Sequence, residues 1–246
     1  ELLGKRVVAL TRFGGYAEYV VANQLVAHEI NYQLSNAAAT ALATQYSTAY
    51  YASNMATNIF EGDHVLIHAA AGGVGLALIQ LAKLKNCVIY ATASSDMKIK
   101  MLEDLGVNYP INSEETEFVE EIENIRGSDG LDIIFDSIGG KSVKKGFRLL
   151  SPGGRIVCYG GSKRSDGRGI INDIKLVIGF GIYSPVTFLM QSKSLIGVNM
   201  LRISDERPSI IKMAMENIID LINQKTIPEP IGRAFPVSDI SEAHNL

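Results

Sequence analysis

Hydrophobic and polar positions change their spacing within one stretch of the chain, residues 65–83. Its sequence, V-L-I-H-A-A-A-G-G-V-G-L-A-L-I-Q-L-A-K, begins with an unbroken apolar run, which is typical of a buried strand. After the glycines, Val74, Leu78 and Leu81 recur at the spacing of one helix face. The stretch therefore predicts a strand, a tight turn and a helix.

The same alternation of patterns continues toward the C-terminus. Glycines mark the turns between the apolar segments. Strands that alternate with helices favour a doubly wound parallel sheet, which is an α/β fold of the Rossmann type. The expected strands are residues 88–93, 109–112, 131–136, 155–159 and 195–199, and the expected helices are residues 97–105, 117–125, 143–150 and 204–224.

The two ends of the chain follow a different pattern. Residues 6–10 and 16–22 predict two strands, enough for part of a β domain, and the alanine-rich residues 37–56 predict a helix. Residues 229–232 predict a further strand, and residues 238–244 predict the start of a helix.

Composition limits the class of protein. The 246 residues are 47% hydrophobic and 20% charged, as in a globular protein with one or two cores. The net charge of -3 disfavours nucleic acid as a partner. Polar residues interrupt the most apolar stretch, residues 170–190, so we expect no membrane span. Cys87 and Cys158 suit a reducing compartment and no secretory pattern opens the sequence, so we expect a cytoplasmic location.

The glycine turn carries the first candidate chemistry. Ala70, Gly72 and Gly75 occupy the glycine positions of the dinucleotide pattern G-x-G-x-x-G, with alanine at the first. The absent side chains of Gly72 and Gly73 let the backbone approach a pyrophosphate, which the helix dipole favours, and Gly75 lets the helix pack tightly on the strand. A purely structural turn is the alternative, but the strands on both sides favour nucleotide binding.

The nucleotide is indicated by the end of the strand at residues 88–93. A site for NAD usually has an acidic residue there, whereas this strand leads to Ser94 and Ser95, and Asp96 belongs to the next helix. The hydroxyls and the cation of Lys98 suit a 2′-phosphate, although Lys98 has an exposed helix lysine as its alternative interpretation. The sequence therefore favours NADPH as the cofactor.

The sheet also predicts where a ligand binds. Ligands of doubly wound sheets bind beyond the carboxyl ends of the strands, so we expect residues 94–98, 112–113, 136–139 and 160–163 to line the site.

Other chemistries find less support. The four histidines lack the spacing of a zinc site, and neither cysteine lies in a recognisable nucleophile elbow. Hydride transfer, in which a cofactor carries the chemistry, remains.

Several motifs occur together: F-G-G-Y-A-E-Y-V at residues 13–20, T-A-Y at 48–50, the glycine turn, D-S-I-G-G at 136–140 and S-P-G-G-R at 151–155. With them the chain resembles the zinc-independent quinone oxidoreductase (zeta-crystallin-like) branch of the medium-chain dehydrogenase/reductase family. The resemblance implies NADPH-dependent reduction of a small-molecule quinone or α,β-unsaturated carbonyl compound.

The resemblance also implies a division into domains. Residues 1–45 would be the C-terminal part of a GroES-like substrate domain, residues 46–200 an NADP-binding Rossmann domain, and residues 201–246 a segment that returns to the GroES-like domain. Family members begin well upstream of residue 1, so we expect the N-terminal part of the GroES-like domain to be absent from this sequence. The apolar segment before Leu195 and the strand after it would suit an edge-to-edge homodimer.

Site residues follow from the resemblance by motif match. It places Thr48 at the nicotinamide, the turn amides at the pyrophosphate, Ser94 and Lys98 at the 2′-phosphate, and Ser113 where these reductases often have an adenosine-binding tyrosine. The expected cofactor-binding residues are Thr48, Ala71, Gly72, Gly73, Val74, Ser94, Lys98, Ser113, Gly160 and Val198.

Two features of the site remain to be predicted: whether it binds a metal ion and which residue donates the proton. Thr11, Arg12 and Thr44 stand where zinc-dependent relatives carry cysteines, so we expect no metal. No proton donor is identified; Tyr46 is the best candidate, and a packed helix tyrosine is its alternative interpretation.

Two other functions stay open. One is a structural or regulatory protein that binds the nucleotide without turnover. The other is an enoyl-thioester reductase, for which the cluster Lys163, Arg164 and Arg168 would provide basic residues. The substrate itself is not fixed by the sequence, because pocket shape in this fold comes from loops.

Overall fold

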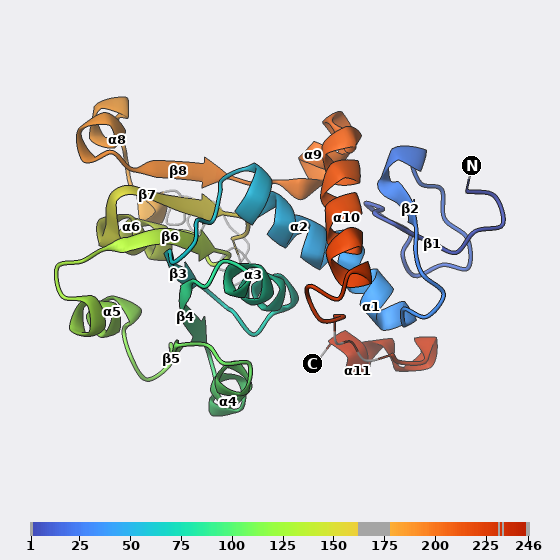
Figure 1. Cartoon of the computed structure of the whole chain (residues 1–246), viewed down its shortest axis with the longest axis horizontal. Helices are drawn as coiled ribbons and strands as arrows, with labels where there is room; N and C mark the ends of the chain where they lie inside the picture. The colour runs from blue at the N-terminus through green and yellow to red at the C-terminus, as the bar shows by residue number, and fades with distance from the viewer. Residues whose placement is uncertain (1, 162–177, 231, 233, 245–246) are drawn as a thin grey trace. The chain divides into compact units, whose positions relative to one another are not determined.

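The structure is a computed structural model that describes residues 2–161, 178–230, 232 and 234–244. Its main feature is a six-stranded sheet with strand order β5-β4-β3-β6-β7-β8, in which all pairs are parallel (Figure 1). This sheet confirms the predicted α/β class. The strands are β3 (His64–Ile67), β4 (Val88–Ala93), β5 (Tyr109–Asn112), β6 (Leu131–Asp136), β7 (Leu150–Cys158) and β8 (Ser194–Gly197).

Helices connect the strands and cover both faces of the sheet. The strand order reverses between β3 and β6, and right-handed crossovers therefore place α3 and α4 on one face and α5 and α6 on the other. The core holds Leu66, Tyr90, Ile134, Phe147 and Ile156. The helices are α3 (Gly73–Lys83), α4 (Asp96–Asp104), α5 (Phe118–Arg126), α6 (Lys141–Leu149) and α8 (Pro185–Gln191).

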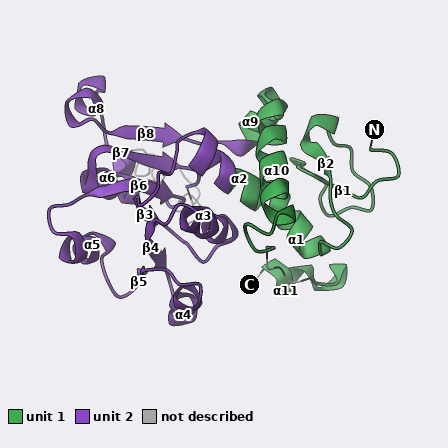
Figure 2. Ribbon diagram, viewed as in Figure 1, with its two compact units in different colours: residues 1–48, 201–246 green, residues 49–200 purple. Residues whose placement is uncertain are grey.

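The chain divides into two compact units (Figure 2). Unit 2, residues 49–200, contains the sheet, and unit 1 consists of residues 1–48 and 201–246. The boundary falls within α2 (Ser47–Tyr50). The assignment of these units to GroES-like and NADP-binding domains stays a prediction.

Unit 1 is built on a helix that packs against a short antiparallel pair. The buried face of α10 contacts η1, β2 and η2. Val8 of β1 pairs with His28 of β2. The elements of the unit are β1 (Val7–Ala9), η1 (Gln24–Val26), β2 (Ala27–Glu29), α1 (Asn36–Ala41), the π-helical η2 (Leu42–Tyr46), α9 (Met200–Glu206), α10 (Pro208–Asn223), η5 (Val237–Asp239) and α11 (Ile240–His244), where Met200 lies just before the unit boundary.

Three predicted elements differ in the structure. Residues 16–22 form no strand, because Tyr19 and Val21 are 90% and 96% exposed and no described strand pairs with them. The helix predicted at 204–224 is two helices, since Pro208 lacks an amide hydrogen and begins α10. The helix at 37–56 is interrupted by two π-helical turns, η2 and η3 (Tyr51–Met55).

Some expectations fall on residues that the structure does not describe. Residues 229, 230 and 232 are not in a strand, and residue 231 lies outside the described residues. Residues 170–177 of the segment at 170–190 and the positions 162–163 also lie outside them. So does the basic cluster Lys163, Arg164 and Arg168.

Candidate functional site

A pocket of about 610 Å³ lies in unit 2 at the carboxyl ends of β3, β4 and β5. The parallel register brings these ends together, since Ile67 pairs with Ala91 and Ala93 pairs with Asn112. The pocket unites five of the predicted cofactor residues, which come from three separate strand ends. These are Ala71, Gly72, Ser94, Lys98 and Ser113.

The turn after β3 presents backbone amides at the start of α3. Leu76 donates the first helical hydrogen bond to the carbonyl of Gly72 (2.9 Å). The amides of Gly73 and Val74 precede it and have no hydrogen-bond partner among the described residues. The amide of Gly72 already donates to the carbonyl of Ala69 (3.0 Å). The N-terminus of α3 therefore offers the free amides of Gly73 and Val74 and the positive end of a helix dipole.

Gly75 allows this helix to begin close to the strand. A Cβ atom at Gly75 would lie 2.4 Å from the carbonyl oxygen and 2.6 Å from the Cα atom of Ala70. Both contacts are with backbone, which cannot rotate away. The close approach agrees with the role that the motif predicts for the last glycine.

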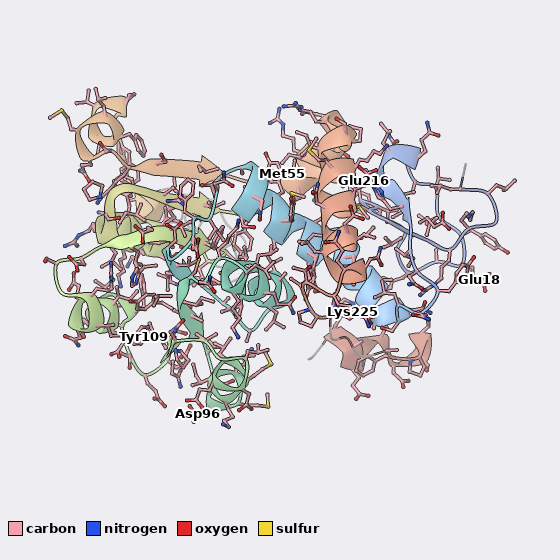
Figure 3. The ribbon with its side chains drawn as sticks, in the orientation of Figure 1. Glu18, Met55, Asp96, Tyr109, Glu216 and Lys225 are labelled. Carbon is pink, nitrogen blue, oxygen red and sulfur yellow. The ribbon has the colours of Figure 1, made fainter. Side chains whose placement is uncertain are left out.

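The far end of the pocket has exposed polar groups and a cation. Ser94 and Lys98 are exposed, and the Ser113 hydroxyl donates to the carbonyl of Ala93 (3.1 Å). Asp96, the first residue of α4, accepts a hydrogen bond from the side chain of Asn112 (2.9 Å), and the carboxylates that line the pocket are Glu114 and Glu117. Figure 3 shows Asp96 beside α4, which it begins. The strand end itself carries no acidic residue, as the sequence indicates.

The pocket lining also contains two polar residues that sequence reasoning missed, His68 and Thr92. His68 is buried, its Nδ1 lies 3.1 Å from Thr92 Oγ1, and its Nε2 has no partner among the described residues. Burial lowers the pKa of His68, against the opposing effect of Asp136. Its ring lies edge-on to Phe118, 4.7 Å between centroids. The sequence signal that could have identified His68 is its position as a polar residue directly after the apolar run of β3.

The remaining predicted residues lie elsewhere. Gly160 and Val198 follow β7 and β8, where the Val198 amide donates to the carbonyl of Cys158 (2.8 Å). Thr48 belongs to unit 1, and its hydroxyl donates to the carbonyl of Thr44 (2.6 Å). Tyr46 is buried within unit 1. None of these residues lines the pocket of unit 2, and their contact with a cofactor stays a prediction.

Comparison with models of protein families shows which family the chain belongs to. Residues 73–216, more than half of the chain, match the model described as "Zinc-binding dehydrogenase". The chain belongs to this family. It is therefore a member of the medium-chain dehydrogenase/reductase family, as its motifs indicate.

Individual relatives within the family differ in name. The synaptic vesicle membrane protein VAT-1 homolog of Homo sapiens is 30% identical over 243 residues, covering 98% of this chain and 61% of that protein. Human quinone oxidoreductase is 28% identical over 242 residues, covering 98% and 68%. The crystal structure of JamJ enoyl reductase in its apo form matches with a TM-score of 0.81 and 25% identity, covering 98% and 68%. This chain thus spans less than two thirds of the VAT-1 homolog.

Zinc, which gives the dehydrogenase family its description, finds no donor set in the described part of the chain. There, no group of three or more histidine, cysteine or acidic side chains could hold a metal ion. The thiols are also poor ligands in this setting: burial raises the pKa of Cys158 to about 12 and that of Cys87 to about 11.

Among the described helices, none has the length and apolar character that crossing a bilayer requires.

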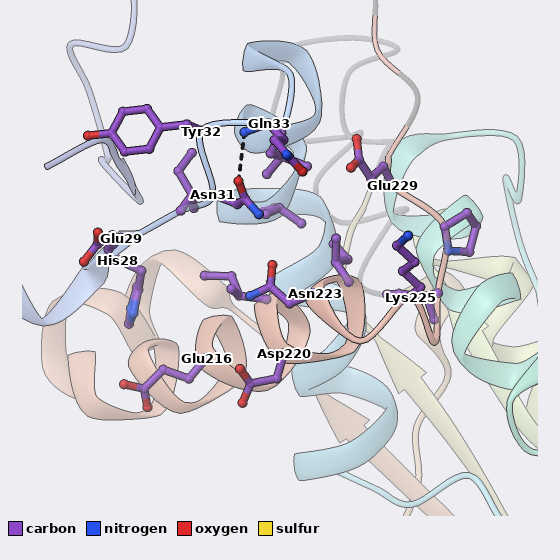
Figure 4. Close-up of a pocket in the computed structure, with 17 residues that line it drawn as sticks. His28, Glu29, Asn31, Tyr32, Gln33, Glu216, Asp220, Asn223, Lys225 and Glu229 are labelled. Carbon is purple, nitrogen blue, oxygen red and sulfur yellow. Dashed lines mark hydrogen bonds between the residues drawn. The ribbon is translucent and has the colours of Figure 1, made fainter.

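A second cavity, of about 1250 Å³, lies in unit 1 between β2 and α10 (Figure 4). It is lined by the acidic residues Glu29, Glu216, Asp220 and Glu229 and by His28, whose Nε2 lacks a described partner. Glu29 pairs with a lysine and so does Glu216, which offsets part of this charge. No predicted cofactor residue lines this cavity.

Proposed function

We propose that the protein is an NADPH-dependent oxidoreductase that works without zinc and reduces quinones or α,β-unsaturated carbonyl compounds by hydride transfer. The observation that carries the proposal is the pocket of unit 2. Its lining brings Gly72, which directly precedes the free amides of α3, together with Ser94 and Lys98 at a strand end that lacks a carboxylate. Family membership and the name of human quinone oxidoreductase support the reaction type.

Each end of the pocket has a proposed role in holding the cofactor. The amides of Gly73 and Val74 would donate to the pyrophosphate, because they have no other described partner. Gly72 and Ala71 would let the nucleotide approach the backbone. Ser94 and Lys98 would bind the 2′-phosphate, and Ser113 would contact the adenosine.

The nicotinamide end rests on the family resemblance alone. The bound nicotinamide supplies the hydride, and Thr48 is the residue proposed to contact it. Backbone near Gly160 and Val198 is proposed to line the rest of the cofactor. Because Tyr46 is buried, we assign the proton to solvent or to a substrate-side hydroxyl rather than to this residue. The missing donor set among the described residues supports a reaction without zinc.

Enoyl reduction is the second candidate, since the chain resembles JamJ enoyl reductase over 98% of its length. A nucleotide-binding protein without turnover is the third. We also propose a cytoplasmic protein, because both described cysteines are free thiols that suit a reducing compartment.

A homodimer along the sheet edge is part of the proposal. The outer edge of β8 has no described partner strand. Beside it, Ile182, Leu189 and Met190 are exposed large apolar side chains on and before α8. An open strand edge next to exposed apolar side chains favours pairing with a second copy.

Turnover is the direct test of the function. The full-length polypeptide is mixed with NADPH or NADH and with 9,10-phenanthrenequinone, a small enone or an enoyl thioester, and cofactor oxidation is followed by absorbance. We expect oxidation of NADPH in preference to NADH with the quinone or enone. Turnover of the thioester alone would favour the enoyl reductase, and NADPH binding without any turnover would favour the non-catalytic role.

The phosphate assignment has its own test, Lys98→Ala. A hydrogen bond to a charged group contributes about 1.5–3 kcal/mol, so NADPH affinity should fall roughly 10- to 100-fold while NADH affinity hardly changes. Lys100→Ala is a matched control on the same helix, because Lys100 pairs with Glu103 and Asp104 and does not line the pocket. Equal loss of both cofactors in the Lys98 variant would remove the assignment.

A further inference from the structure

The turn that leads into α3 contains a residue in an unusual conformation. Ala69 has a φ of 49°, in the left-handed region that residues with a side chain seldom adopt. It lies directly between the end of β3 and the glycines. A conformation of this kind persists only where surrounding contacts hold it.

Thr92 on the neighbouring strand β4 supplies those contacts. Its Oγ1 accepts the amide of Ala69 (3.2 Å), and its carbonyl accepts the amide of Ala70 (2.9 Å). The same Oγ1 lies 3.1 Å from Nδ1 of His68. One buried residue thus bonds three consecutive residues of the turn.

These bonds continue to the start of the helix. The carbonyl of Ala69 accepts the amide of Gly72, and the carbonyl of Gly72 accepts the first helical amide. The conformation that Thr92 imposes on Ala69 therefore sets the direction of the free amides of Gly73 and Val74.

The contact between Thr92 Oγ1 and Nδ1 fits two tautomers of His68. The Thr92 hydroxyl has one hydrogen, and it accepts the Ala69 amide, so its own hydrogen is available for Nδ1 of His68. His68 would then carry its proton on Nε2. In the other tautomer, Nδ1–H donates to the second lone pair of Oγ1; in both forms Nε2 has no partner among the described residues.

We propose that Thr92 is a positioning residue of the nucleotide site, which holds the turn so that the α3 amides bind the pyrophosphate. The inference rests on the proposed binding of NADPH. It separates two parts of the pocket: Thr92 acts on the pyrophosphate through the turn, whereas Lys98 acts on the 2′-phosphate directly.

Two ligands and two variants test this separation. Thr92→Val keeps the shape and removes the hydroxyl, and Thr92→Ser keeps the hydroxyl. Affinities of the full chain are measured for NADPH and for adenosine 2′-monophosphate, which has the 2′-phosphate and no pyrophosphate. We expect Thr92→Val to weaken NADPH about tenfold and adenosine 2′-monophosphate by less than twofold, with Thr92→Ser close to the unchanged protein. Lys98→Ala should weaken both ligands.

A spectroscopic readout accompanies the affinities. The ¹⁵N chemical shifts of His68 report which ring nitrogen carries the proton, and they should agree in the unchanged protein and Thr92→Ser and change in Thr92→Val. If Thr92→Val fails to fold, Thr92→Cys, which has only a weak sulfur acceptor, gives the same comparison.

The outcomes are distinguishable from failure of the proposed function. If the unchanged protein binds neither ligand, the proposed NADPH site is wrong. If it binds NADPH and Thr92→Val binds NADPH equally well, the positioning role is wrong. Equal weakening of both ligands in Thr92→Val would also overturn it, because a general loss of structure affects the whole pocket.

Discussion

Replacing Gly75 by alanine should separate α3 from β3. The new Cβ would lie 2.4 Å from the carbonyl oxygen of Ala70, roughly 1 Å inside an ordinary contact distance of about 3.5 Å. Because the obstructing atoms are backbone, relief requires the whole start of α3 to move. The helix buries Leu78, Ile79 and Leu81 against the rest of unit 2, so the movement also loosens the core.

Overpacking of a tight core costs about 1–3 kcal/mol, and backbone obstruction places Gly75→Ala near the upper limit, about 3 kcal/mol. Urea unfolding followed by circular dichroism measures the free energy of unfolding. Gly197→Ala is the control, since a Cβ at Gly197 meets nothing within 4 Å. A loss below about 1 kcal/mol in Gly75→Ala, or an equal loss in Gly197→Ala, would refute the packing argument.

Three further predictions concern buried groups of unit 2. Arg155→Met should lower the free energy of unfolding by about 3 kcal/mol, because it leaves the buried carboxylate of Asp63 without its partner. That carboxylate is 11% exposed and lies 2.6 Å from the guanidinium of Arg155. An unchanged urea midpoint would contradict this prediction. Burial lowers the pKa of His68 below its ordinary value of about 6.5, so the unfolded state binds more protons than the folded state. The free energy of unfolding should therefore fall as the pH drops below about 6.5. This fall should be smaller in His68→Gln than in the unchanged protein. Raised pKa values of about 12 for Cys158 and about 11 for Cys87 predict slow labelling by iodoacetamide at pH 8 until urea unfolds the chain, and rapid native labelling would show accessible thiolates.

The central strands could be predicted from the sequence because their signal is local. β4, β5 and β6 have the predicted bounds, since a strand buried in a parallel sheet is a short apolar run between polar or glycine positions. β7 begins five residues earlier than predicted: the S-P-G-G stretch resembles a turn, yet Leu150 pairs with Leu131 across an irregularity of the ladder. Residues 16–22 alternate like a strand but lack a partner, which a single-strand pattern does not report.

The pocket divides in the same way. Gly72 and Ser94 could be predicted as pocket residues, because each is identified by a local signal: Gly72 by the glycine motif and Ser94 by its position directly after a strand. His68 and Thr92 could not, since their contact joins two strands across 24 residues of sequence. The burial of Tyr46 likewise depends on how unit 1 packs.

The division of the chain has a consequence for its synthesis. Unit 2 is one continuous segment, so it has all its own residues once residue 200 has been made. Unit 1 does not, because α10 supplies the apolar face on which η1, β2 and η2 pack. Because synthesis proceeds toward the C-terminus, residues 1–48 must wait for residues 49–200 and then α10 to be made before unit 1 can pack. During this interval their apolar side chains are exposed to chaperones and to aggregation.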